Sequence, residues 1–562
     1  MTLEQFLLNF TIFHPLLGAA AVALLARDAK QSKNIGTVVS LVTLALTVFL
    51  AARLNATQFQ LQFVTSVDWV SALGIRYAVG LDGTNAWLVV LSSLMTLVAV
   101  STTRDDTKNL KGFYALIFAL QTAMLGAFTA LDLVLFFTFF ELTLLPMYFL
   151  INFWGTGNAR KTAAKFLIFT FAGSVFTLIG IAGLAITHRN VAGSLEFGLI
   201  ELQSMVANGK LWVGSESQTV LFWLFALGFL VKAPCFPFHS WIGDTYEDSP
   251  KAGPILSSAM VKLGSYGLLR FCLPLFPEAV QSQAPILIGL ATVSILYGAI
   301  AAIAQTDMRR LMGYSTLSHM GFVLLGIFSL SYVGMVGAAF QQLAHGVTTA
   351  ILVVLVWHLL EQYGTAKLDA FGGLKAKMPI FSLLFFLGLL GNVGLPGTMG
   401  FVGEFTALMG AFESGARGTF GISVGFAAAA GAGVVLAAVY LLVMYQKVFY
   451  GPERLQEGPD WTDVRAASMV PVFGLIGLMF VGGLYSTVFT APTEASTQAI
   501  RLMATSLPTQ RPSLSNPDQK IDLEPTAQQG ALVDTRTGTV ITPGRLRGYV
   551  VAPVPTVAEV NP

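Results

Sequence analysis

Long runs of apolar residues, separated by short polar segments, fill most of the chain up to residue 490. A helix that crosses a bilayer needs roughly 20 mostly apolar residues. The chain divides into about fourteen such spans, at residues 6–25, 36–52, 83–101, 113–129, 131–151, 163–186, 219–238, 252–275, 285–304, 311–329, 334–360, 379–410, 422–449 and 467–489. The pattern predicts an all-α polytopic membrane protein.

Composition supports this prediction, because 54% of the residues are hydrophobic and 11% are charged, against about 25% charged residues in soluble proteins. The net charge is +2 and the basic residues are dispersed. We therefore exclude a nucleic-acid partner, whose binding depends on gathered positive charge, and expect membrane lipids around the chain.

The lysines and arginines predict the orientation in the membrane. They concentrate in the loops after odd-numbered spans, for example in segments 27–33, 104–111 and 160–165, whereas loops after even-numbered spans hold few, such as Arg53 and Arg76. Cytoplasmic loops carry the excess of positive charge. Both termini are therefore expected outside the cytoplasm, and residues 6–25 are interpreted as a retained span, not a signal peptide.

Prolines and glycines interrupt spans seven and twelve. Pro234 and Pro237 lie in span seven, and Pro396 lies among glycines in span twelve. Proline has no backbone N–H to donate, so these residues are expected to leave carbonyls without helical donors, at Leu230, Ala233 and Asn392.

Two broken spans five helices apart are typical of transporters built from inverted repeats. We predict two inverted five-helix repeats, each with a broken helix. The predicted organisation is an N-terminal group of three spans (1–112), the first repeat (113–276), the second repeat (284–450), a last span (451–490) and a polar, flexible tail (491–562).

Six ionisable residues lie inside predicted spans, where each costs about 2.5–3.5 kcal/mol at the helix centre: Glu141, Lys232, Lys262, His319, His345 and Glu404. A structural ion pair or a capped helix end explains a single such residue. Six residues on six spans instead favour proton transfer through the membrane.

The neighbours of these residues refine that hypothesis. Lys232 lies beside the broken part of span seven, where freed carbonyls can order water, and lysine readily gains or loses a proton when buried. Lys262 has Ser258 and Tyr266 one turn on either side, which indicates a polar stripe.

The two histidines also have polar residues one turn away. Ser315 precedes His319, and Gln341 precedes His345. Histidine can relay protons near neutral pH through its two ring nitrogens. A hydrogen-bonded core residue is the alternative for His319, and haem ligation is a weaker alternative for the pair.

Other polar residues near span ends receive structural interpretations. Asp132 is expected to cap a helix N-terminus. His239, Trp241 and Asp244 are expected to order the loop after span seven, with a proton-entry role as the weaker alternative. Arg270 is either a buried counter-ion or a snorkelling end residue.

Several of these segments resemble the proton-translocating antiporter-like subunits of respiratory complex I (NADH:quinone oxidoreductase). The resemblance rests on the segments around Glu141 (135–148), Lys232 (231–244), Lys262 (260–270), His319 (314–321) and His345 (344–346). Among the large subunits of that family, the M-type is similar to this chain in carrying Glu at the position of Glu404.

The resemblance implies a proton-translocating subunit that is coupled to quinone reduction elsewhere in a complex in the bacterial inner membrane. Neighbouring antiporter-like subunits are the implied partners, and FMN, iron–sulfur clusters and quinone are expected in other subunits. No redox centre is expected on this chain, because Cys235 and Cys272 both lie in apolar stretches and form no CxxC motif.

The resemblance also implies roles for the six residues. Glu141 tunes Lys232, Lys232 is the gated carrier, Glu404 is the exit-side carrier, and the other three form the relay. Two alternatives remain open, namely a subunit of a multi-subunit cation/proton antiporter and a structural spacer that conducts no protons.

Overall fold

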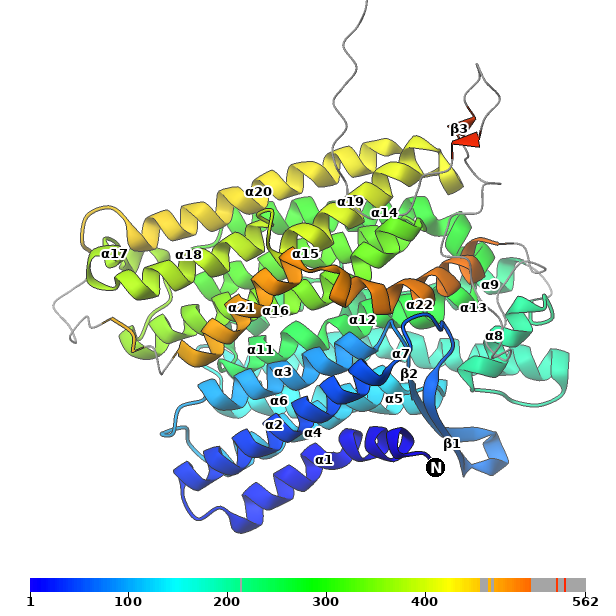
Figure 1. Ribbon diagram of the computed structural model, residues 1–562, viewed down its shortest axis with the longest axis horizontal. Helices are drawn as coiled ribbons and strands as arrows, with labels where there is room; N and C mark the ends of the chain where they lie inside the picture. Colours follow the sequence, from blue (N-terminus) through cyan, green and yellow to red (C-terminus); the bar gives the residue numbers. More distant parts are fainter. Residues whose placement is uncertain (213–214, 455–462, 466–468, 507–531, 534–539, 542–562) are drawn as a thin grey trace, which may run out of the picture. The chain divides into compact units, whose positions relative to one another are not determined.

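The computed structural model of the chain describes residues 1–212, 215–454, 463–465, 469–506, 532–533 and 540–541. Most of these residues are helical (Figure 1). The helices are α1 (Leu3–Leu25), α2 (Ala29–Arg53), α3 (Ala86–Thr102), α4 (Leu110–Thr129), α5 (Leu133–Leu142), α6 (Leu144–Trp154), α7 (Ala159–Ala192), α8 (Leu199–Ala207), α9 (Ser215–Lys232), α10 (Ser240–Asp248), α11 (Ala252–Met260), α12 (Lys262–Gly267), α13 (Leu273–Leu275), α14 (Pro277–Ile303), α15 (Met308–Phe328), α16 (Tyr332–Tyr363), α17 (Leu374–Lys377), α18 (Pro379–Val393), α19 (Met399–Ala416), α20 (Val424–Phe449), α21 (Val470–Leu484) and α22 (Thr487–Thr505).

Nine helices in the described part of the chain are long and apolar enough to cross a membrane, and the bent pair α21 and α22 can form a tenth. Helices α3 and α18 are apolar but shorter. The prediction of an all-α polytopic membrane protein is confirmed. The count of fourteen spans stays a prediction.

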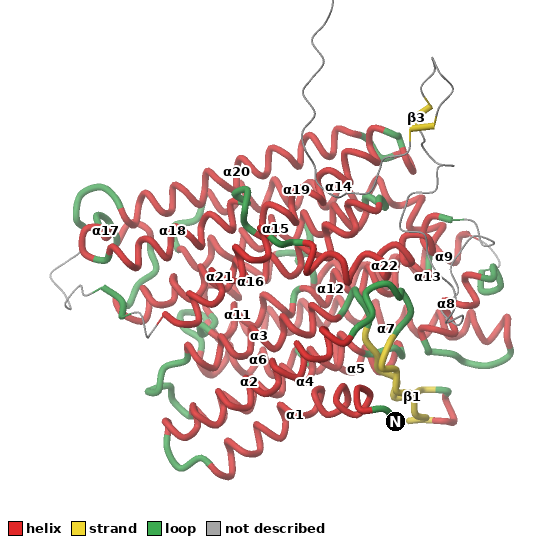
Figure 2. The backbone as a smooth tube through the Cα atoms, viewed as in Figure 1, coloured by secondary structure: helices red, strands yellow, loops and turns green. Residues whose placement is uncertain are grey.

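A β-hairpin occupies part of the predicted loop between spans two and three. Strand β1 (Gln62–Val70) pairs antiparallel with β2 (Ile75–Leu81), and Gly74 closes the turn with a φ of 74°. Figure 2 shows the hairpin in yellow among the helices. The apolar pattern does not predict these strands, because they are much shorter than the roughly 20 residues of a membrane-spanning helix.

The predicted polar tail begins too early in the sequence. Helix α22 continues to Thr505, well beyond residue 491. Its buried face consists largely of small and weakly polar residues, among them Thr493, Ser496 and Ala499, so the burial is not visible as an apolar pattern. Residues Met1–Ile521 form one compact unit.

Residues Asp522–Pro562 form a second unit. Its described part is the antiparallel ladder of β3 (Leu532–Val533) and β4 (Val540–Ile541). The other tail residues beyond 506 lie outside the described part of the chain, and so does the prediction that they are flexible.

Both predicted helix breaks are present. Helix α9 ends at Lys232 and α10 begins at Ser240, whereas α18 ends at Val393 and α19 begins at Met399. One detail was wrong, because the Leu230 carbonyl accepts a hydrogen bond from the Cys235 amide at 3.1 Å. The organisation as two inverted repeats stays a prediction.

The ion pairs near the helix ends identify two opposite faces of the helical part of the chain. Lys33, at the beginning of α2, pairs with Asp105 at 2.9 Å. Both lie in predicted loops after odd-numbered spans, and we call this lysine-rich side the basic face. Arg76 pairs with Glu201 at 2.7 Å on the opposite face. Among the described residues, no ion pair joins the two faces, in agreement with the predicted alternation of the loops.

A buried ion pair fixes helix segments near the opposite face. Arg270 lies in a π-helical turn (Leu268–Cys272), and its guanidinium contacts the Asp82 carboxylate at 2.6 Å and the Thr84 hydroxyl at 2.5 Å. Arg270 is 3% exposed and Asp82 is 1% exposed. Arg270 is therefore a buried counter-ion, which was one of its two predicted roles.

We expect Asp82→Ala to lower the unfolding free energy by about 3–5 kcal/mol, because it leaves the Arg270 charge buried and unpaired. Denaturant titration of the protein in detergent measures this loss. Glu413→Ala is the control, since it removes a half-buried partner of the exposed Arg417 and should cost less than about 1 kcal/mol. Equal losses in both variants would contradict a buried charge pair.

Candidate functional site: a buried row of ionisable residues

The first part of the site lies at the interruption between α5 and α6. Thr143 separates the two helices and accepts a 2.8 Å hydrogen bond from the Lys232 ammonium, which also lies 4.8 Å from the centre of the Phe140 ring. Lys232 is buried at the end of α9. A hydroxyl and an aromatic face together stabilise a positive charge in an apolar region.

Glu141 lies one turn from Phe137 and two residues before Thr143, and it is partly exposed at the surface of the chain. Its carboxylate interacts electrostatically with Lys232, and the hydroxyl of Ser174 in α7 donates to the Phe171 carbonyl at 2.9 Å. The Oε1 atom of Glu141 has no hydrogen-bond partner among the described residues. The predicted pairing of Glu141 with a lysine is thus present as an electrostatic interaction, without a contact short enough for an ion pair.

The second part of the site begins at Lys262, the first residue of α12. Its Nζ atom lies 2.6 Å from Nδ1 of His345 in α16. The other ring nitrogen of His345, Nε2, lies 3.3 Å from the Thr349 hydroxyl. Both Lys262 and His345 are buried, so this direct contact can pass a proton between them.

His319 and Glu404 continue the second part. Nδ1 of His319 in α15 lies 2.5 Å from Oε1 of Glu404 in α19, and the Gln341 amide donates to the same oxygen at 3.0 Å. The ring centres of His319 and His345 are 5.6 Å apart. Lys262, His345, His319 and Glu404 therefore form a continuous series across four helices.

We call the six predicted residues the buried row. The structure brings four of them together in direct contact or ring proximity, and it places Lys232 and Glu141 at the adjoining helix breaks. Close packing joins the two parts, because a Cβ on Gly264 of α12 would lie 2.4 Å from the Ala233 nitrogen, next to Lys232. The roles of the six residues stay predictions.

The predicted polar stripe around Lys262 has a different function in the structure. The Ser258 hydroxyl donates to the Ile255 carbonyl at 2.6 Å, and the Tyr266 hydroxyl donates to the Phe128 carbonyl at 2.9 Å. These hydroxyl groups satisfy backbone carbonyls of the helices around Lys262. They do not contact its ammonium group.

Besides Thr349, sequence reasoning missed three residues that contact the row. Thr143, Gln341 and Tyr440 contact Lys232, Glu404 and His319 respectively. Gln341 was noted as a neighbour of His345, one turn away on the same helix. Tyr440 carries a recognisable signal, since a phenol hydroxyl in the middle of an apolar span requires a hydrogen-bond partner.

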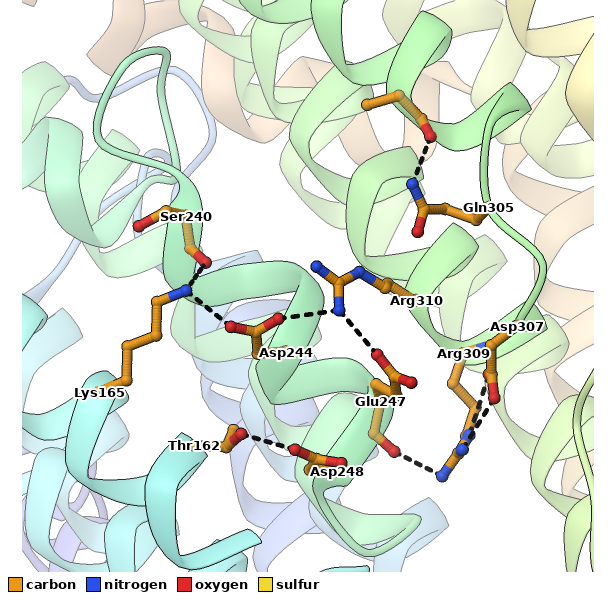
Figure 3. Close-up of polar contacts among 11 residues, drawn as sticks. Thr162, Lys165, Ser240, Asp244, Glu247, Asp248, Gln305, Asp307, Arg309 and Arg310 are labelled. Atoms are coloured by element: carbon orange, nitrogen blue, oxygen red, sulfur yellow. Dashed lines mark hydrogen bonds and ion pairs between the residues drawn. The ribbon is translucent and has the colours of Figure 1, made fainter. Parts of the chain in front are cut away.

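The residues after the α9 break order the basic face, as predicted for Asp244. Its carboxylate lies between Lys165 of α7, at 2.6 Å, and Arg310 of α15, at 3.1 Å (Figure 3). Trp241 donates to the Val231 carbonyl at 3.0 Å, so it ties α10 back to α9. These contacts hold the helix break in a fixed position.

Asp132 caps α5, as predicted, by accepting hydrogen bonds from the Val134 and Leu135 amides at 2.8 and 3.0 Å. It also accepts from the Arg76 amide at 3.1 Å. Burial raises the pKa of this carboxyl group despite these hydrogen bonds. Its position at a helix terminus, with three amide donors, makes it part of the scaffold.

The fold and the row define an antiporter-like, proton-translocating membrane subunit. Residues 130–429 match the family model described as NADH:quinone oxidoreductase/Mrp antiporter, TM. The chain belongs to this family.

Two curated relatives are each similar over most of the chain. A protein named NADH-quinone oxidoreductase subunit M from Rickettsia bellii is 34% identical over 490 residues, which cover 86% of this chain and 96% of the relative. A protein named F(420)H(2) dehydrogenase subunit M from Methanosarcina mazei is 35% identical over 466 residues, covering 82% and 92%. The predicted family is confirmed.

A solved structure has the same fold. A chain of the respiratory complex I from Thermus thermophilus with bound NADH aligns with a TM-score of 0.79 and 26% identity, over 89% of this chain and all of that chain.

We expect Thr143→Val to impair proton translocation, because the Lys232 ammonium loses its hydroxyl acceptor. A hydrogen bond to a charged group contributes about 1.5–3 kcal/mol, so a tenfold or larger decrease in rate is expected. The measurement is proton uptake by membrane vesicles that contain the variant. Thr143→Ser retains the hydroxyl and should retain most of the rate, and an equal loss in both variants would exclude this role for the hydroxyl.

Proposed function

We propose that the chain is the M-type proton-translocating membrane subunit of an NADH:quinone oxidoreductase. The observation that carries this proposal is the continuous contact series from Lys262 through His345 and His319 to Glu404. Its relatives of the M type support the assignment, and so does the family to which the chain belongs.

The buried row provides a path along which protons move between side chains. Lys262 at 2.6 Å from His345 can give its proton to the imidazole and become neutral. His319, once protonated at both ring nitrogens, can give its Nδ1 proton to the Glu404 carboxylate 2.5 Å away, so that the acid and the imidazole both become neutral. A proton taken up at one ring nitrogen and released at the other leaves each histidine unchanged in charge.

Lys232 and Glu141 act before this series. Lys232 is the gated carrier, since its ammonium group is held by Thr143 and influenced by the Glu141 carboxylate. A change in the charge of Glu141 alters how firmly Lys232 holds its proton. Glu404, at the far end of the row, is the exit-side carrier.

The chemistry of electron transfer belongs to other subunits. FMN, iron–sulfur clusters and quinone are expected there, and this chain is a subunit of the oxidoreductase without a redox centre of its own. Neighbouring antiporter-like subunits and lipids are its partners. The partly exposed Glu141 supports a neighbouring subunit at that surface, because a carboxylate facing lipid alone is costly.

The proposed location of the complex is the inner membrane of a bacterium, with the basic face toward the cytoplasm and both termini on the other side. The concentration of lysine and arginine in the loops of the basic face supports this orientation. Ion pairs within that face, such as Lys251 with Glu361 at 2.7 Å, connect loops that the orientation places on the same side.

The alternative function is a subunit of a multi-subunit cation/proton antiporter, which belongs to the same family. Purification of the native assembly separates the two functions. Flavin and iron–sulfur absorbance in the purified assembly is expected for the oxidoreductase. An assembly that contains this chain without these chromophores would favour the antiporter.

We expect Glu141→Gln and Glu404→Gln to abolish NADH-driven proton translocation by the assembled complex, because an amide cannot accept and release a proton as a carboxylate does. NADH oxidation with an artificial electron acceptor, which uses the peripheral arm, should stay at the wild-type rate. Glu413→Gln is the matched control in α19 and should translocate normally. Full translocation by the Glu404 variant would refute its role.

A further variant distinguishes a proton carrier from a structural spacer. Lys232→Ala should reduce proton flux through the reconstituted complex at least tenfold, because the only ammonium group beside Thr143 in the described structure is removed. A spacer would transmit movement equally well with either residue. Unchanged flux in a fully assembled variant would therefore support the spacer.

A further inference from the structure

A tyrosine from outside the buried row contacts the ring nitrogen of His319 that faces away from Glu404. The Tyr440 hydroxyl in α20 lies 3.3 Å from Nε2 of His319. The same hydroxyl lies 2.8 Å from the Ser315 hydroxyl in α15, one turn before His319. All three side chains are buried, so water does not readily replace either contact.

The donors and acceptors around His319 determine which of its ring nitrogens carries the proton. The Glu404 oxygen accepts from the Gln341 amide and faces Nδ1 of His319. A carboxylate accepts hydrogen bonds, so the proton of a neutral His319 ring lies on Nδ1 and its Nε2 is an acceptor. Nε2 can therefore accept a hydrogen bond from Tyr440.

Nε2 is also the nitrogen at which a new proton must arrive. Nε2 first takes up a proton from the side of His345, whose ring centre is 5.6 Å away, and the imidazolium that forms then releases its Nδ1 proton to Glu404. A phenol that donates to Nε2 occupies the lone pair of that nitrogen. As long as it does so, His319 cannot accept a proton from His345.

The phenol has a second acceptor to which it can turn. Tyrosine carries one hydroxyl proton, and that proton can point to His319 or to the Ser315 oxygen, while the phenol itself stays protonated. The shorter distance is to Ser315. The two positions differ by rotation of one O–H bond, so small movements of α15 or α20 can shift the balance between them.

Resting on the proposed function, we infer that Tyr440 is a positioning residue that controls when His319 accepts a proton. With its hydroxyl donated to His319, the row is interrupted between the two histidines. With its hydroxyl donated to Ser315, Nε2 is free and the row conducts. Tyr440 thus prevents protons from flowing back through the row when the complex is not turning over.

The chain contains a matched control for this arrangement. Tyr445, also in α20, lies 2.8 Å from the Ser382 hydroxyl, and both residues are buried. Among the described side chains, neither residue of this second tyrosine–serine pair contacts the row. Tyr445→Phe and Ser382→Ala therefore remove the same groups without touching His319.

The experiment compares the passive proton leak and the NADH-driven translocation of complexes in membrane vesicles. Tyr440→Phe should raise the rate at which an imposed pH gradient decays without NADH, at least threefold, and should lower the number of protons moved per NADH oxidised. Ser315→Ala should leave the passive leak unchanged and should slow translocation, because the Tyr440 hydroxyl then has only His319 as its acceptor.

If Tyr440 had a purely structural role, Tyr440→Phe and Ser315→Ala would change the proton leak and the translocation in the same direction. The control variants Tyr445→Phe and Ser382→Ala would then show equal changes. Equal leak in Tyr440→Phe and Tyr445→Phe would overturn the inference, and so would an added leak in Ser315→Ala. If Tyr440→Phe fails to assemble, the Ser315 variant alone decides between these outcomes. Normal translocation by Glu404→Gln would instead refute the proposed function, whatever the behaviour of Tyr440.

Discussion

The arrangement of this protein depends on the compensation of charges that lie within the membrane. A charged side chain in hydrocarbon loses its hydration, and it is tolerated only beside a partner or in a polar cavity. Each of the row's lysines has such a partner, since Lys232 contacts a hydroxyl and Lys262 contacts an imidazole. The helix breaks and close helix contacts bring these partners together.

Two kinds of charge compensation can be distinguished in the structure. Arg270 and Asp82 form an ion pair whose arginine stays protonated, so it holds helices together and transfers nothing. Lys262 and His345 are joined by a contact in which either nitrogen can hold the proton. This difference in side-chain chemistry separates the scaffold from the proton path.

The helix breaks contribute to both the scaffold and the proton path. After α9 ends at Lys232, α10 is fastened to α7 and α15 through Asp244, so the end of the broken helix has a fixed position. Gly264 allows α12 to approach the same point closely. The lysines of the two parts of the row thereby lie on neighbouring segments, although Lys262 comes thirty positions after Lys232 in the sequence.

The sequence by itself determined the membrane class, the family, the two helix breaks and the identity of the buried ionisable residues. The membrane class, the breaks and the buried residues follow from composition, from helix-breaking residues, from span length and from the high cost of isolated charges in lipid, all of which are local. The family follows from the resemblance of the segments around those residues. The β-hairpin and α22 could not be recognised in this way, because one is short and the other buries small, weakly polar residues. The tertiary structure decided which side chains touch. The contacts of Thr143 with Lys232 and of Tyr440 with His319 join helices far apart in the chain, and no local pattern specifies how distant helices pack.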